Sequence, residues 1–168
     1  MKGLTLYRIL TYILLPIASV LGLLDLFALL AALANPQILL GVFVFTCIVI
    51  YTFASFTFLN KGIAAGKKCK PSLRDWIRVN AFVILVYSFM IFMNLAAVLM
   101  NPSILNDLIK NMPAQSQLPA GITPDYIRNF VMGCLYFMAF LSVVLVIHIF
   151  IGFKLMKHHA NVFLKDAD

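Results

Sequence analysis

The sequence is poor in charge, and its acidic residues are few and of one kind. Among 168 residues there are six aspartates and no glutamate, and charged residues make up 11% of the chain, against roughly 25% in ordinary soluble domains. Hydrophobic residues reach 63%. A water-soluble fold of this composition would lack the polar surface to cover its core. The composition therefore predicts a protein that lies in lipid.

Cysteine and catalytic motifs are scarce as well. Cys47, Cys69 and Cys134 form no CxxC pair and show no Cys/His ligand spacing, so we expect neither a structural disulfide nor a metal site. The sequence also lacks a nucleophile–base pair, a phosphate-binding glycine loop, a zinc signature and paired carboxylates. We therefore expect no enzyme activity and no cofactor.

The basic excess is the main charge feature that is present. Lysine and arginine number 13, and the net charge is +7. In a soluble protein this balance would raise nucleic acid as a partner, but no nucleic-acid-binding motif accompanies it. Loops on the cytoplasmic side of membrane proteins collect lysine and arginine, and such residues attract anionic lipid headgroups. The expected partner is the lipid bilayer.

Four long apolar runs predict an all-α, polytopic membrane protein built from two helical hairpins. The runs cover residues 9–34, 37–59, 79–100 and 129–153, and about 20 helical residues suffice to cross the hydrocarbon layer. Helix is the expected state because lipid cannot satisfy backbone hydrogen bonds. Caps extend the third helix back to about Leu73, through Ser72 and Asp75, and the fourth to Pro124. The expected spans are 9–34, 37–59, 73–100 and 124–153.

The distribution of basic residues predicts the orientation. Eleven of the 13 lysines and arginines lie on one side, in the N-terminal segment, the loop at 60–72 with the helix start that follows it, and the tail at 154–168. The positive-inside rule then places both termini and the 60–78 segment in the cytoplasm. We expect the tail, including His158 and His159, to be solvated, and the 60–78 segment to lie against anionic headgroups.

The first span has a second interpretation. Lys2 and Arg8 precede an apolar run that ends in Ala32-Leu33-Ala34, which resembles a signal-peptidase site. The run is longer than the usual signal-peptide core of about 7–15 residues, and Asp25 interrupts it. We therefore expect the segment to be retained as a membrane span.

The two hairpins share a sequence pattern. Residues 31–39 read AALANPQIL and residues 96–105 read AAVLMNPSIL. Both odd-numbered spans would run in the same direction, so a duplication would be of the parallel type. The alternative is that a cap followed by proline recurs by chance.

The outer loop, residues 101–123, contains a second structural signal. Between Ser103 and Met112, apolar residues recur on one helical face, which predicts a short amphipathic helix on the outer interface. A lid or a partner-docking segment is the alternative.

Asp25 is the main candidate for a functional residue. It would lie about 15 Å from the outer end of its span, where a charged side chain is costly and faces the bundle interior. Thr46 lies at a similar depth and Asn94 within reach of a tilted helix, so these three residues form the expected intramembrane polar cluster. His148 is too far along its span to join them, and no continuous proton relay is predicted.

Two functions remain open from the sequence. The preferred one is a non-catalytic accessory or scaffold subunit whose spans pack with a copy of itself or with another membrane protein, and in which a protonated Asp25 links two helices. The alternative is a small oligomeric transporter or channel that uses Asp25 to couple protons or another cation. The compact size and short loops favour the bacterial inner membrane as the location.

Overall fold

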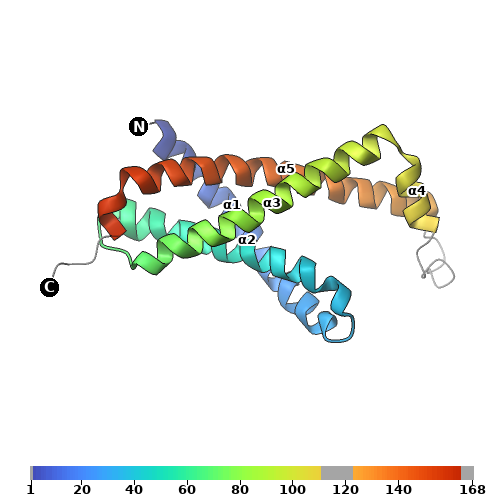
Figure 1. Cartoon of the computed structure of the whole chain (residues 1–168), viewed down its shortest axis with the longest axis horizontal. Helices are drawn as coiled ribbons and strands as arrows, with labels where there is room; N and C mark the ends of the chain where they lie inside the picture. Colours follow the sequence, from blue (N-terminus) through green and yellow to red (C-terminus); the bar gives the residue numbers. More distant parts are fainter. Residues whose placement is uncertain (1, 111–122, 164–168) are drawn as a thin grey trace. The chain divides into compact units, whose positions relative to one another are not determined.

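The computed structural model describes residues 2–110 and 123–163, and every regular element in those ranges is helical (Figure 1). Four helical segments are long and apolar enough to cross a membrane, as the composition predicts. The elements are α1 (Lys2–Ala32), η1 (Pro36–Ile38), α2 (Leu39–Thr57), η2 (Phe58–Ala64), α3 (Pro71–Met100), α4 (Ser103–Lys110), α5 (Pro124–His158) and η4 (Ala160–Phe163).

The chain divides into two compact units. The first combines Met1–Val86 with Val144–Asp168, and the second is Tyr87–Val143. Both long helices α3 and α5 contribute one part to each unit. The first unit therefore contains α1, α2, the opening turns of α3 and the final turns of α5, and it holds most of the buried polar side chains.

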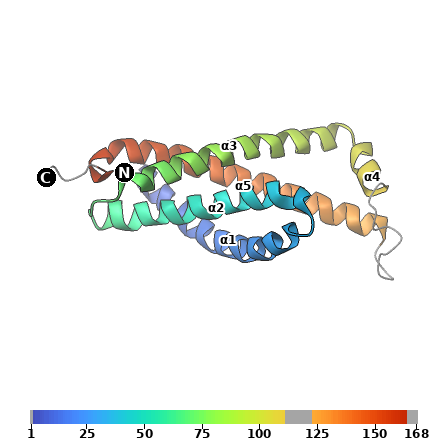
Figure 2. The same cartoon turned by 60° about the horizontal axis from the view of Figure 1, so that its bottom comes forward.

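A tight turn joins α1 to α2 in the first unit. The chain reverses direction over residues 33–35 (Figure 2). The side-chain oxygen of Asn35 accepts a hydrogen bond from the backbone N–H of Gln37 at 3.2 Å, and Pro36 opens the next helix. This is the predicted arrangement of a capping residue followed by proline. Proline lacks a backbone N–H, but at the start of a helix that N–H would have no acceptor within the helix.

Two small residues of α1 are buried or lie in close contact, and Gly22 faces α2. Ala18 is buried, and a Cβ atom added at Gly22 would lie 3.4 Å from Cγ2 of Val49. That distance is ordinary van der Waals contact, so the helices approach closely at Gly22 without requiring glycine. Pro16, inside α1, cannot donate the backbone hydrogen bond that its position would normally give to the carbonyl of Tyr12.

The C-terminal end of α2 widens into the π-helix η2, and η4 packs against it. The rings of Phe58 and Phe163 stack with centroids 5.2 Å apart. The backbone N–H of Cys69 donates to the carbonyl of Val162 at 2.8 Å. A Cβ atom at Gly62 would lie 3.0 Å from Val162 Cγ1, so the lack of a side chain at Gly62 permits this contact.

Two expectations about helix ends need correction. The helix α3 begins at Pro71, so Ser72 lies inside the helix and does not cap it near Leu73. Proline is favoured at the first helical position because the backbone N–H there has no partner within the helix, so none is lost. The tail is not simply solvated, because α5 continues to His158 and η4 follows with Val162 and Phe163 buried. Residues 164–168 of the expected tail lie outside the described residues.

The second unit carries its own caps. The Oγ1 atom of Thr123 accepts a hydrogen bond from the backbone N–H of Tyr126 at 3.2 Å, and α5 starts at Pro124. The helix α4 occupies Ser103–Lys110, where the sequence predicts a short amphipathic helix, and Leu105 and Ile109 are buried among the side chains of α4 that the structure describes. The remainder of that prediction, including Met112, falls in 111–122, which lies outside the described residues.

Candidate functional site

Asp25 and Thr46 meet between α1 and α2. The Thr46 hydroxyl donates a hydrogen bond to Oδ2 of Asp25 at 2.6 Å. The Asp25 side chain is 8% exposed, although Thr46 itself lies on the exposed face of α2. Because α1 ends at Ala32, Asp25 lies about 10 Å from the helix end at 1.5 Å per residue, which is less than the expected 15 Å.

The second carboxylate oxygen of Asp25 lacks a hydrogen bond. Within the described residues, Oδ1 is buried and has no hydrogen-bond partner. A buried carboxylate oxygen without a donor is costly in an apolar environment. Asn94, the third member of the expected cluster, is an exposed residue of α3 in the second unit. The described contacts therefore join Asp25 to Thr46 only.

A larger polar group lies elsewhere in the first unit and was not predicted from the sequence. We call it the His148 cluster, and its members come from three helices: Tyr7 and Thr11 from α1, Tyr51 and Ser55 from α2, and His148 from α5. All five side chains are at most 1% exposed.

Both ring nitrogens of His148 are hydrogen bonded. Nε2 lies 2.8 Å from Oγ1 of Thr11, and Nδ1 lies 2.7 Å from the hydroxyl of Tyr51. The Thr11 hydroxyl donates its proton to the carbonyl of Tyr7 at 2.7 Å, so Oγ1 must accept from Nε2–H. We assign the neutral tautomer with the proton on Nε2 from this pattern, and Tyr51 then donates to Nδ1.

The tyrosine rings hold the imidazole on two further sides. The Tyr7 ring stacks on His148 with centroids 4.4 Å apart, and Tyr51 approaches it edge-on at 5.5 Å. Gly152, one turn after His148, leaves room for this packing, because a Cβ atom there would lie 3.2 Å from Cε2 of Tyr7. The Ser55 hydroxyl is buried beside the two tyrosine side chains and has no hydrogen-bond partner among the described residues.

The His148 cluster had a signal in the sequence. Tyr7 and Thr11 are four residues apart, as are Tyr51 and Ser55, so each pair shares a helical face. Both pairs and His148 also lie toward the end of their spans that carries most of the lysine and arginine residues. The depth of His148 in its span is similar to that of Thr11 and Tyr51, which makes a contact among the three possible but does not indicate which helix faces meet.

Metal ligands do not gather in the described part of the chain. Searched over residues 2–110 and 123–163, the structure contains no group of three or more histidine, cysteine or acidic side chains that could hold a metal ion. Cys69, in the loop before α3, is buried. Burial raises the pKa of its thiol above the usual value, and the positive charge of Lys61 partly opposes that rise.

The two polar sites differ in kind. The His148 cluster ties α1, α2 and α5 together with its imidazole fully hydrogen bonded, whereas the Asp25–Thr46 pair retains one unbonded carboxylate oxygen among the described residues.

Comparison of the chain with protein-family models, with curated proteins and with solved structures found no match.

Proposed function

We propose that the protein is a non-catalytic multi-pass membrane protein, an accessory or scaffold subunit whose spans associate in the bilayer with a copy of itself or with another membrane protein. The observation that carries the proposal is the hydrogen bonding of His148. Both of its ring nitrogens bind side chains of other helices in the same chain. A polar residue bound in this way fixes helix packing.

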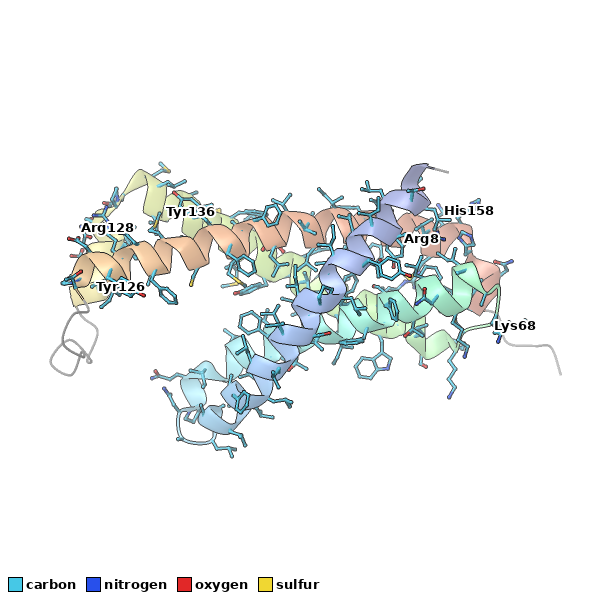
Figure 3. The ribbon with its side chains drawn as sticks, turned by 180° about the vertical axis from the view of Figure 1, so that it is seen from behind. Arg8, Lys68, Tyr126, Arg128, Tyr136 and His158 are labelled. Atoms are coloured by element: carbon cyan, nitrogen blue, oxygen red, sulfur yellow. The ribbon has the colours of Figure 1, made fainter. Side chains whose placement is uncertain are left out.

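The proposed orientation has both termini and the 60–78 segment in the cytoplasm, and the proposed location is the bacterial inner membrane. The gathering of basic residues supports the orientation. Figure 3 shows Arg8, Lys68 and His158 at the same end of the first unit. Lysine and arginine at one end of a helical bundle are typical of its cytoplasmic side.

We also propose that the two hairpins arose by a parallel duplication. The local geometry of the two Asn-Pro sites supports this. Asn35 accepts a hydrogen bond from the backbone N–H of Gln37, and Asn101 accepts one from that of Ser103 at 3.3 Å. In both cases the asparagine precedes a proline and the donor lies two residues later.

Purification of the full chain from its membrane in mild detergent tests the scaffold proposal. We expect a defined assembly, either a homo-oligomer or a stoichiometric complex with one other membrane protein, measured by light scattering and mass spectrometry. Asp25→Asn should leave the assembly and its abundance unchanged, as should the control Asp75→Asn at an exposed position. A monomer without partners, or an assembly lost in Asp25→Asn alone, would overturn the proposal.

A second function, an oligomeric transporter or channel for protons or another cation, is favoured by one observation. Oδ1 of Asp25 is buried and has no hydrogen-bond partner among the described residues. A cation, a water molecule or a donor from a second copy could bind there. Four spans leave little room for an aqueous path within one chain, so this function requires a dimer or larger oligomer.

Flux in reconstituted vesicles separates the two functions. The transporter requires proton or cation movement that exceeds that of empty vesicles and is lost in Asp25→Asn but retained in Asp75→Asn. Under the scaffold proposal, all three proteins give the flux of empty vesicles.

A further inference from the structure

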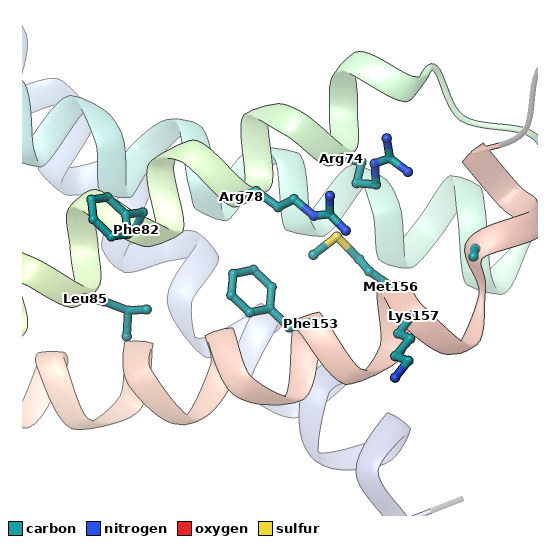
Figure 4. Close-up of a pocket in the computed structure, with 8 residues that line it drawn as sticks. Arg74, Arg78, Phe82, Leu85, Phe153, Met156 and Lys157 are labelled. Carbon is teal, nitrogen blue, oxygen red and sulfur yellow. The ribbon is translucent and has the colours of Figure 1, made fainter.

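A cavity of about 580 Å³ opens between α3 and α5 in the first unit (Figure 4). Its volume falls in the usual range for small-molecule sites. The lining residues on α3 recur on one helical face, as do those on α5. They are Arg74, Arg78, Phe82 and Leu85 on α3, Phe153, Met156 and Lys157 on α5, and Ala160 just after it.

The cavity is polar at one end and apolar at the other. Arg74 and Arg78 lie in the first two turns of α3, and Lys157 lies in the last turn of α5. Phe82 and Leu85 follow further along α3, in the direction of the apolar span. A ligand that fits this order has an anionic group at one end and a hydrocarbon chain at the other.

The described residues compensate the cations of the cavity poorly. Among the residues that the structure describes, the cavity lining includes three basic residues and no acidic one. Arg74 makes a long ion pair with its neighbour Asp75, with Nε 3.6 Å from Oδ1, and Nε is buried without a hydrogen bond. Arg74, the fourth residue of α3, also lies near the helix N-terminus, where the helix dipole favours an anion and disfavours a cation. An anion in the cavity would give Nε of Arg74 a hydrogen-bond acceptor and would balance the positive charge near the helix N-terminus.

We propose that this cavity is a specific binding site for one anionic phospholipid. Its phosphate binds Arg74, Arg78 and Lys157, and one acyl chain lies along Phe82, Leu85 and Phe153. Basic pockets between membrane helices on the cytoplasmic side recognise such headgroups. The inference rests on the membrane placement proposed above but not on the scaffold role, because lipid binding can be measured on the isolated chain.

A lipid titration of the delipidated full chain in detergent, followed by native mass spectrometry, tests the site. We expect phosphatidylglycerol to bind with at least tenfold higher affinity than phosphatidylcholine, which has the same tails and no net charge. Equal affinity of the wild-type protein for the two lipids would overturn the proposal, independently of how any variant folds.

Two matched double variants localise the site. Arg78→Gln/Lys157→Gln removes two cations from the cavity, and we expect about 30-fold weaker phosphatidylglycerol binding, roughly fivefold for each cation. Arg8→Gln/Lys154→Gln removes the same two residue types at positions that do not line it, and binding should change less than threefold. Equal losses in the two variants would mean that the protein binds anionic lipid through its overall charge, contrary to the proposal.

Competition with soluble anions identifies the ligand's source. Glycerol phosphate and inorganic phosphate carry the anionic group without a tail, and neither should displace phosphatidylglycerol at a hundredfold excess. Displacement by either would identify a phosphate site and overturn the assignment to a lipid.

Discussion

The hydrogen bond between Thr11 and His148 should contribute measurably to stability, and Thr11→Val tests it. Valine keeps the shape of threonine and removes the hydroxyl. Nε2–H of His148 would then be buried without an acceptor, because Thr11 Oγ1 is its partner at 2.8 Å. Leaving one buried donor unpaired costs about 1–3 kcal/mol, and interhelical hydrogen bonds in membrane proteins reach at most about 1.7 kcal/mol in double-mutant cycles. We expect a loss of about 1–2 kcal/mol in the free energy of unfolding.

Thr52→Val is the matched control. Thr52 is as fully buried as Thr11, and its hydroxyl also donates to a backbone carbonyl one turn earlier, that of Ile48 at 2.8 Å. It differs in lying outside the His148 cluster. The difference between the two variants therefore isolates the bond to His148, and it should be about 1 kcal/mol.

Unfolding of the purified protein by sodium dodecyl sulfate in mixed micelles, followed by circular dichroism, provides the measurement. A double-mutant cycle completes it: in a His148→Phe background, Thr11→Val should cost no more than Thr52→Val. Equal losses for the two threonine variants in the wild-type background, or no coupling between Thr11 and His148, would refute the reasoning.

Three further results follow from the packing and the loops. Gly152→Ala should lower the free energy of unfolding by about 1–2 kcal/mol because its Cβ meets Tyr7, whereas Gly133→Ala on the same helix, with nothing within 4 Å, should be neutral or slightly stabilising. Alkylation of Cys69, followed by peptide mass spectrometry, should reach its half-maximal rate at a higher pH than alkylation of a short peptide of the same local sequence, because burial raises the pKa of the thiol; the same midpoint for both would contradict the burial. In sealed vesicles, and with the three native cysteines replaced by serine, a maleimide that cannot cross membranes should label Lys67→Cys only from the proposed cytoplasmic side and Ser103→Cys only from the other; labelling of both from one side would contradict the orientation.

Features that depend on nearby residues could be predicted from the sequence. The four long helices follow from uninterrupted apolar runs, and the caps at Asn35 and Thr123 follow from residue type and the adjacent proline. The bond between Asp25 and Thr46 belongs to the same class, because a turn of three residues brings their helices together and fixes their relative depth.

Features that join distant parts of the chain could not be read in the same way. The His148 cluster needs α1, α2 and α5 to present particular faces to one another, and spans that are apolar on all sides give little periodicity from which to infer those faces. The stacking of Phe163 on Phe58 depends on a π-helical turn that no local sequence rule indicates. The sequence therefore does not indicate that Val162 and Phe163 are buried.

The contrast between the two polar sites shows where function is most sensitive to substitution. The His148 ring is fully bonded, so its variants should lower stability without creating or removing a binding group. Among the described residues, Asp25 has one bonded and one unbonded carboxylate oxygen, so Asp25→Leu removes a group that is costly to bury together with its bond to Thr46. If Asp25 serves mainly to hold α1 against α2, Asp25→Leu should destabilise the protein as Thr46→Val does. If instead the unbonded oxygen binds a cation or a donor from a second copy, Asp25→Leu should raise the stability of the isolated chain and abolish flux or assembly. Such a gain of stability with a loss of function is the usual trade-off at a functional site.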